Sequence, residues 1–180
     1  MAYTQCSQIS AGINARCDTS MGGIIEVAIA NYEPAIFKFD ESDKKVAANL
    51  AAELKWYGFR FRKGTSSMTS TLNIDDANGV NYVSTELTMI FGKMDTEKRL
   101  AIAGLAAGEV VAVVKDANGK YWALGYDEPV TASAGEGVTG TARGDGNHYS
   151  ITLLDNSTTF PYEVSNGDAV FDAIQEASHS

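Results

Sequence analysis

The chain has 180 residues and a mass of 19.2 kDa, which fits one domain with short appendages. Apolar residues make up 44%, enough for a core, and a formal net charge of -9 makes the surface as a whole repel polyphosphate, which argues against a conventional DNA- or RNA-binding module. No stretch reaches the roughly 18 to 20 consecutive apolar residues of a membrane-spanning helix, and no signal-peptide pattern opens the chain, so we expect a soluble protein that is not exported through a cleaved signal.

Residues 1–22 are expected to form an amino-terminal arm. Cys6 and Cys17 lie in this stretch with ten residues between them. Without a secretory signal the expected state is two thiols, with a disulfide as the alternative in an oxidising compartment. A zinc site would need more ligands at shorter spacing, and the only histidines are His148 and His179.

Alternation of apolar and polar residues predicts most of the middle of the chain as strands. Ile24 to Ala30 is the first such segment, and Tyr57 to Arg62 places aromatic side chains on one face and arginines on the other. Between them, Lys44 to Leu54 has the composition of a helix.

A long, mostly polar hairpin is predicted from Ser67 to Ile74 and from Val80 to Phe91. The tetrapeptide Asp-Ala-Asn-Gly at Asp76 to Gly79 supplies its turn, since Asn and Gly tolerate positive φ angles. In the second strand Leu87, Met89 and Phe91 point inward and Glu86 and Thr88 outward. Because the hairpin carries little apolar surface, we expect it to pair with something else, such as another copy of itself.

A helix is predicted next, from a cap at Asp95 or Thr96 to Ala107, with Gly108 as its stop. The apolar run Val110 to Val114 predicts a central strand covered on both faces. The same tetrapeptide at Asp116 to Gly119 joins it to Tyr121 to Leu124.

The rest of the chain is expected to hold one strand and one helix. Residues 132–146 are rich in glycine and predict a mobile connection, followed by a strand with Tyr149, Ile151 and Leu153 on one face. A carboxy-terminal helix is predicted over 168–180, with Val170, Phe171, Ile174 and Ala177 on one face, as an appendage able to dock on a neighbour.

No motif in the sequence predicts catalysis, a cofactor or a metal ion. Gly135 to Gly140 spells the Gly-x-Gly-x-x-Gly pattern of dinucleotide-binding turns, but a strand follows instead of the helix that the chemistry requires. His148 has no nucleophile elbow to serve, and the clustered acids at turns are typical of solvated surface. We therefore expect a protein that is not an enzyme.

Four stretches resemble tail tube and related tail structural proteins of tailed bacteriophages, especially phages of Bacteroidetes hosts. They are Cys6 to Cys17 with the following Gly22-Gly23-Ile24, Phe59 to Ser67, Met94 to Leu100, and Gly119 to Gly125. The resemblance implies a single mainly β domain (α+β), an antiparallel β-sandwich or open barrel with one packed helix. It also implies a virion structural protein, assembled in the host cytoplasm into rings, commonly hexameric, that stack into a tube.

In such a tube the partners are further copies of the chain and other tail proteins, and DNA passes without being bound. Hairpin edges that pair between subunits give the interface candidates Met68, Ser70, Leu72, Ile74, Leu87, Met89 and Phe91. Carboxylates facing the lumen would keep a polyanion sliding. Glu86 is a lumen candidate, and Asp75 and Asp76 are candidates for the lumen or for contact with the adjacent ring.

Other interpretations stay open at this point. A tail-terminator, neck or decoration protein of the same fold is one, and the length expected of the carboxy-terminal helix favours such a specialised ring. A carbohydrate- or ligand-binding β-sandwich is another, for which exposed Trp56, Tyr121 and Trp122 would form a platform.

Overall fold

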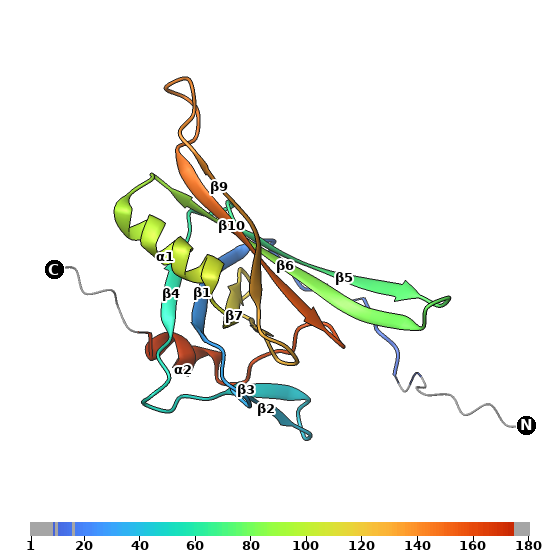
Figure 1. Cartoon of the computed structure of the whole chain (residues 1–180). Helices are drawn as coiled ribbons and strands as arrows, with labels where there is room; N and C mark the ends of the chain where they lie inside the picture. Colours follow the sequence, from blue (N-terminus) through green and yellow to red (C-terminus); the bar gives the residue numbers. More distant parts are fainter. Residues whose placement is uncertain (1–8, 10, 16, 175–180) are drawn as a thin grey trace, which may run out of the picture.

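A computed structural model describes residues 9, 11–15 and 17–174 (Figure 1). Antiparallel strands dominate and form two four-stranded sheets, which do not close into a barrel. The chain is therefore the α+β sandwich that the resemblance implies, and the open barrel is not formed.

The first sheet has the strand order β4-β1-β7-β8, and all of its neighbours are antiparallel. Its strands are β1 (Ile24–Asn31), β4 (Tyr57–Arg60), β7 (Val110–Asp116) and β8 (Tyr121–Leu124). Strand β7 is buried on both faces, as its apolar run predicts. Val111 and Val113 enter one core cluster, and Val110, Ala112 and Val114 enter the other.

The second sheet has the order β5-β6-β10-β9 and packs on one face of the first. Its strands are β5 (Ser67–Asp75), β6 (Val80–Gly92), β9 (Thr131–Val138) and β10 (His148–Ser157). The predicted long hairpin is confirmed as β5 and β6. Gly79 at its turn has a φ of 65°, the positive angle expected there.

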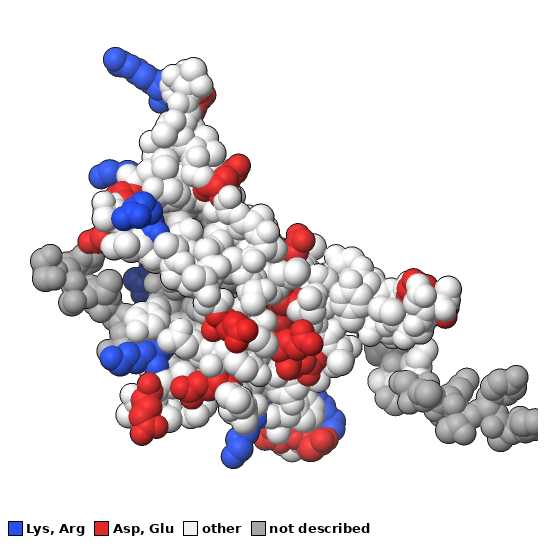
Figure 2. Space-filling view, viewed as in Figure 1, with Lys and Arg blue, Asp and Glu red and all other residues white. Residues whose placement is uncertain are grey.

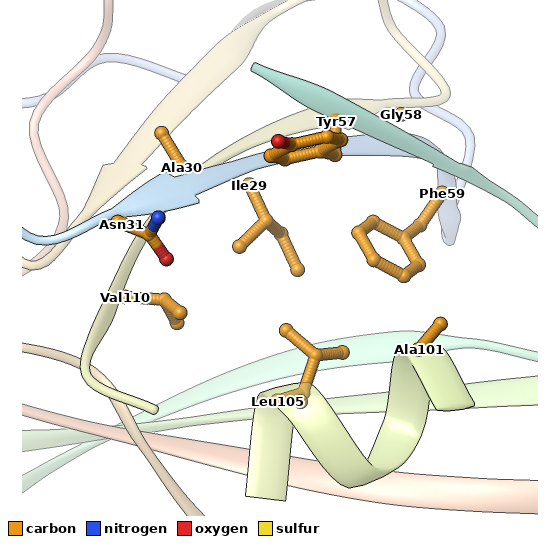
Figure 3. Close-up of a pocket in the computed structure, with 10 residues that line it drawn as sticks. Ile29, Ala30, Asn31, Tyr57, Gly58, Phe59, Ala101, Leu105 and Val110 are labelled. Atoms are coloured by element: carbon orange, nitrogen blue, oxygen red, sulfur yellow. The ribbon is translucent and has the colours of Figure 1, made fainter. Parts of the chain in front are cut away.

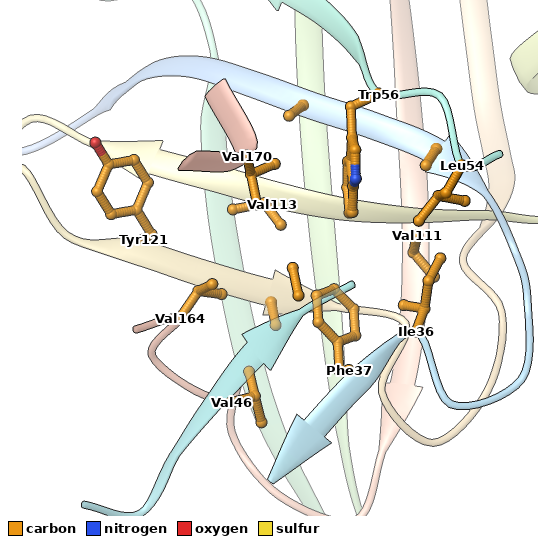
Figure 4. Packing of buried hydrophobic residues seen from close by; sticks show 14 residues of the cluster. Ile36, Phe37, Val46, Leu54, Trp56, Val111, Val113, Tyr121, Val164 and Val170 are labelled. Atoms are coloured by element: carbon orange, nitrogen blue, oxygen red, sulfur yellow. The ribbon is translucent and has the colours of Figure 1, made fainter. Parts of the chain in front are cut away.

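A smaller hairpin and a short helix cover the other face of the first sheet. Strands β2 (Phe37–Asp40) and β3 (Lys45–Ala48) pair with each other, and helix α2 spans Gly167–Asp172. Figure 4 shows their side chains meeting those of β7 around the indole of Trp56. The helix predicted over Lys44 to Leu54 is wrong, because Val46 and Ala48 alternate inward as a strand requires.

Helix α1 (Thr96–Ala107) closes one side of the sandwich between the two sheets. Asp95 caps it, since its side chain accepts a hydrogen bond from the Lys98 backbone N–H at 2.8 Å. Leu105 is buried in the shared core and Ile102 packs against it. The predicted helix and its stop at Gly108 are confirmed.

The predicted mobile connection at 132–146 is wrong in its first half, which is strand β9. Its glycines serve close packing: a Cβ added to Gly135 would lie 3.3 Å from the Ser150 carbonyl oxygen, and one added to Gly137 would lie 3.0 Å from the Tyr149 ring. The connection between β9 and β10 is confined to residues 139–147.

The carboxy-terminal helix differs from its predicted span of 168–180. Helix α2 ends at Asp172, Ile174 forms a bridge to Trp56, and residues 175–180 lie outside the described part of the chain. Val170 is fully buried and Phe171 packs on the same core, so the described helix docks on its own domain. The long carboxy-terminal helix that favoured a specialised ring is thus absent from the described residues.

We expect the two Leu residues of the hairpin to differ sharply in their effect on stability. Leu87→Ala removes a fully buried side chain and should lower the free energy of unfolding by about 2–5 kcal/mol, measured by urea denaturation. Leu72→Ala, at a side chain 45% exposed on the same hairpin, should change it by less than about 1 kcal/mol. Equal losses would contradict the assignment of Leu87 to the core.

Candidate functional site: the open face and free edges of the second sheet

The outer edges of the two sheets differ in their backbone hydrogen bonding within the chain. In the first sheet, Ala123 N–H donates to the Tyr162 carbonyl at 2.9 Å and Val164 N–H donates to the Tyr121 carbonyl at 2.8 Å, so residues 162–164 cover the outer edge of β8. The Trp56 to Ile174 bridge lies just before β4, and the Ile174 side chain packs against Gly58 of that strand. Just before β9, Val130 exchanges backbone hydrogen bonds with Val110, but within the described residues β5 and β9 themselves carry no backbone pairing along their outer edges.

An ion pair fastens the segment that covers β8. The Glu163 carboxylate accepts from Lys120 Nζ at 2.7 Å and from Lys45 Nζ at 3.0 Å. The hydrogen bond from Lys120, helped by that from Lys45, holds the pKa of Glu163 below its ordinary value. Since Val46 N–H also donates to the Glu163 carbonyl, this segment joins the β2–β3 hairpin to the first sheet.

The outward face of the second sheet is mostly polar, with Ile90 and Leu154 as apolar residues on it, and is left uncovered by the other elements. The register places Thr69 opposite Glu86, Thr88 opposite Thr152, and Ser150 opposite Glu136 on this face. Thr88 and Thr152 hydroxyls lie 3.2 Å apart. Glu86 and Glu136 are both exposed. Strands β5, β6, β9 and β10 contain no Lys or Arg, although the chain has 14.

The hairpin of β5 and β6 projects beyond the sandwich, and acidic atoms lie at its tip (Figure 2). The Asp75 carboxylate accepts from the backbone N–H groups of Ala77 and Asn78 and from the Asn78 side chain at 2.6 Å. The Asn78 hydrogen bonds hold the pKa of Asp75 below its ordinary value. Asp75 therefore stabilises the turn, while Asp76 beside it is exposed.

The seven predicted interface residues fall into two groups. Leu72 and Ile74 are exposed, on the part of the hairpin that projects. Leu87 and Met89 are fully buried in the molecule's own core, and their assignment to a subunit surface is corrected by that burial. The remaining three are partly buried against the same chain: Met68 and Phe91 on the shared core and Ser70 on Thr85.

A row of polar side chains crosses the inward face of the second sheet where the sandwich ends. Ser70 Oγ lies 2.8 Å from Thr85 Oγ1, and Thr85 is opposite Asp155 on β10. Asp155 is 2% exposed, and its Oδ1 accepts from Gly125 N–H at 3.3 Å. Burial raises the pKa of Asp155 to about 6, the Gly125 hydrogen bond opposes this, and Asp127 and Glu128 add to it.

The sequence contains a signal for this row of polar side chains. In a strand every second residue lies on the same face. Thr85 therefore shares the inward face of Leu87 and Met89, and Asp155 shares that of Ile151 and Leu153. No comparable alternation marks Glu136, because half of the residues in its strand are Gly or Ala.

The aromatic platform that would support carbohydrate binding is not formed. Trp56 is 1% exposed and Tyr121 9% exposed, within the core on the far face of the first sheet. Trp122 is partly buried and donates from Nε1 to Asp116 at 3.0 Å. These contacts make all three structural.

Among residues 9, 11–15 and 17–174, no group of three or more His, Cys, Asp or Glu side chains is placed to hold a metal ion. None of the helices in that part is long and apolar enough to cross a membrane. Cys17 is exposed, and Cys6 lies outside the described residues, so the predicted thiol state remains a prediction.

Comparisons with known proteins returned no relationship: no family model matches the chain, and no curated protein or solved structure is significantly similar to it.

The buried carboxyl predicts a specific pH dependence of stability. Asp155 has a pKa of about 6 in the folded chain and about 3.9 when unfolded, so its stabilising contribution is full below pH 3.9 and is lost as pH rises through 6. The Asp155→Asn variant carries no titrating carboxyl at this position, so it does not lose this stability as pH rises. The difference in free energy of unfolding between the variant and the unaltered chain should therefore increase in favour of the variant by about 3 kcal/mol between pH 3.5 and pH 7. Urea denaturation at both pH values measures it.

Asp76→Asn makes the same charge change at an exposed position and serves as the control. A stability difference between Asp155→Asn and the unaltered chain that stays constant with pH would contradict the raised pKa.

Proposed function

We propose that this chain is a virion structural protein, a subunit of a bacteriophage tail tube that forms rings through its second sheet. The observation that carries the proposal is the contrast in edge pairing. The chain covers the β8 edge of the first sheet with its own residues 162–164, whereas β5 and β9 have no backbone partner on their outer edges along nine and eight residues. Uncovered edges of this length favour pairing with another strand.

The strand directions suit pairing between identical copies. β5 and β9 lie at opposite ends of the second sheet, and each neighbouring pair from β5 to β9 is antiparallel. β5 and β9 therefore run in opposite directions. If a second copy continues the sheet, its β9 meets β5 as one more antiparallel pair. Such an interface joins two different surfaces head to tail, and it closes into a ring when the rotation between copies permits.

The outward face of the second sheet is suited to line the bore of such a ring. Its Ser and Thr side chains are neutral, Glu86 and Glu136 are negative, and no Lys or Arg lies on its strands. DNA binding in the absence of base readout depends on neutralising phosphates with Lys and Arg. A bore lined this way would let DNA pass without retaining it. The proposed role needs no cofactor and no catalytic residue.

The remaining parts of the proposal follow the resemblance to tail tube proteins. Rings of this kind, commonly hexameric, would stack into a tube in the virion after assembly in the host cytoplasm. Asp76 and the exposed Ile74 lie near the tip of the projecting hairpin, where they would meet an adjacent ring or neighbouring tail proteins.

Proline on β5 tests the sheet pairing. Neighbouring residues of a strand direct their N–H groups to opposite edges, so of Thr71 and Leu72 one donates toward β6 and the other toward the open edge. One variant, Thr71→Pro or Leu72→Pro, should stay folded by circular dichroism yet fail to assemble in sedimentation velocity, because it lacks a donor only at the open edge. The other should lose stability.

The unaltered chain is the positive control for assembly. If the proline variant that stays folded still assembles normally, pairing through β5 is contradicted.

Charge reversal tests the lining of the bore. The double variant Glu86→Lys with Glu136→Lys should retain duplex DNA at low salt and release it as salt rises, whereas the unaltered assembly should not retain it. Glu97→Lys with Glu109→Lys makes the same charge change at two exposed positions off the second sheet and is the matched control. Equal retention by both double variants, measured by fluorescence anisotropy, would argue against an acidic bore on this face.

A further inference from the structure

A groove without charged side chains runs between helix α1 and strand β4. About 390 Å³ in volume, it has the buried Ile29, Leu105 and Val110 in its floor, and Phe59 and Ala101 along its sides (Figure 3). A second hollow of about 260 Å³ shares Gly58, Phe59 and Ala101 with it and extends it toward Glu97 and Lys98. The pair forms one channel that is apolar at the Leu105 end.

The amino-terminal arm offers a segment of matching chemistry. Residues 9–15 read Ile-Ser-Ala-Gly-Ile-Asn-Ala, a stretch with no charge and two large apolar side chains. Ile9 is 95% exposed and Ile13 is fully exposed. Isolated exposed apolar residues are ordinary on a protein surface, but a segment whose only large side chains are both fully in water gains free energy by burying them.

The structure directs this arm away from the groove of its own chain. Asn118, in the β7–β8 turn, accepts from Met21 N–H at 2.8 Å and donates to the Met21 carbonyl at 3.0 Å, and Ala117 N–H donates to the Gly23 carbonyl. The arm thus leaves beside Asp116, which pairs with Ile24 at the start of β1. The groove lies at the other end of β1, where Asn31 pairs with Val110.

The same tetrapeptide forms both hairpin turns, but its Asn side chain has different partners in the two. In the β5–β6 turn the Asn78 side chain binds Asp75 of its own turn. In the β7–β8 turn the side chain of Asn118 instead binds the backbone of Met21, 97 residues away in sequence. The described part of the arm then runs on the opposite side of the molecule from α1 (Figure 1).

We propose that the amino-terminal arm of one copy places Ile9 and Ile13 in the groove between α1 and β4 of a second copy. This rests on the proposed homo-oligomeric function and adds a second contact between copies, independent of the sheet edges. Asn118 is a positioning residue in this contact, because it fixes where the arm leaves its own domain.

Cross-linking between two populations of the full chain tests the contact. One carries Ile13→Cys and the other Ala101→Cys, and both carry Cys6→Ser and Cys17→Ser. A short bismaleimide should yield a covalent dimer when the two are mixed, and Ala103→Cys, exposed on the same helix but outside the groove, should yield far less. A chain bearing both cysteines that cross-links within a monomer would overturn the proposal, since its own arm then fills the groove.

Assembly measurements separate this inference from the proposed function. Ile13→Ser and Ala101→Glu should each raise the concentration needed for assembly by roughly tenfold or more, and the double variant should be no worse than the worse single one, because both remove one contact. Ala103→Glu is the charge-matched control. Rings that form with unchanged concentration dependence in both variants would refute arm docking alone, whereas an unaltered chain that never assembles would refute docking and the ring function together.

Discussion

An edge strand leaves a row of backbone N–H and C=O groups without a protein partner, and this constraint organises the whole molecule. In the first sheet the β8 edge is paired within the chain: residues 162–164 pair with β8, and the Lys120 and Lys45 contacts to Glu163 hold that segment in place. The second sheet does not meet this constraint within one chain. Its two free edges lie at opposite ends, which makes continuation into another copy the direct way to satisfy both.

The burial pattern explains why the two sheets differ in this way. Strand β7 is covered on both faces, so the first sheet is the centre of the fold, and the segment around Val164 that packs on it also closes its β8 edge. The second sheet has only one covered face. Its inward side ends at the Ser70, Thr85 and Asp155 row, and its outward side keeps hydroxyls and carboxylates in water. Acidity that argues against nucleic-acid binding is, in a bore, a condition for letting DNA pass.

Much of this fold could be predicted from the sequence because its signals are local. Alternation located β1, β4, β6 and β10, the Asp-Ala-Asn-Gly turn located β5, a continuous apolar run located β7, and the Asp95 cap with Gly108 located α1. The wrong predictions have a common cause: tertiary contacts, and not local composition, determined the secondary structure of those segments. The glycines of β9 resemble those of a loop but allow close approach to β10. Val46 and Ala48 lie in a segment of helix-forming composition, yet pairing with β2 makes it a strand. The polar composition of the hairpin indicated that β5 pairs further, but the sheet order that leaves β5 and β9 at the two edges has no local sequence signal.

Electron microscopy of the purified, concentrated chain tests the central claim most directly. The account predicts rings, or tubes of stacked rings, in which the β5-β6-β10-β9 sheet continues from copy to copy and turns the face bearing Glu86 and Glu136 toward the bore. A chain that stays monomeric at high concentration, or rings that place this face on the outside with β5 and β9 unpaired, would contradict it.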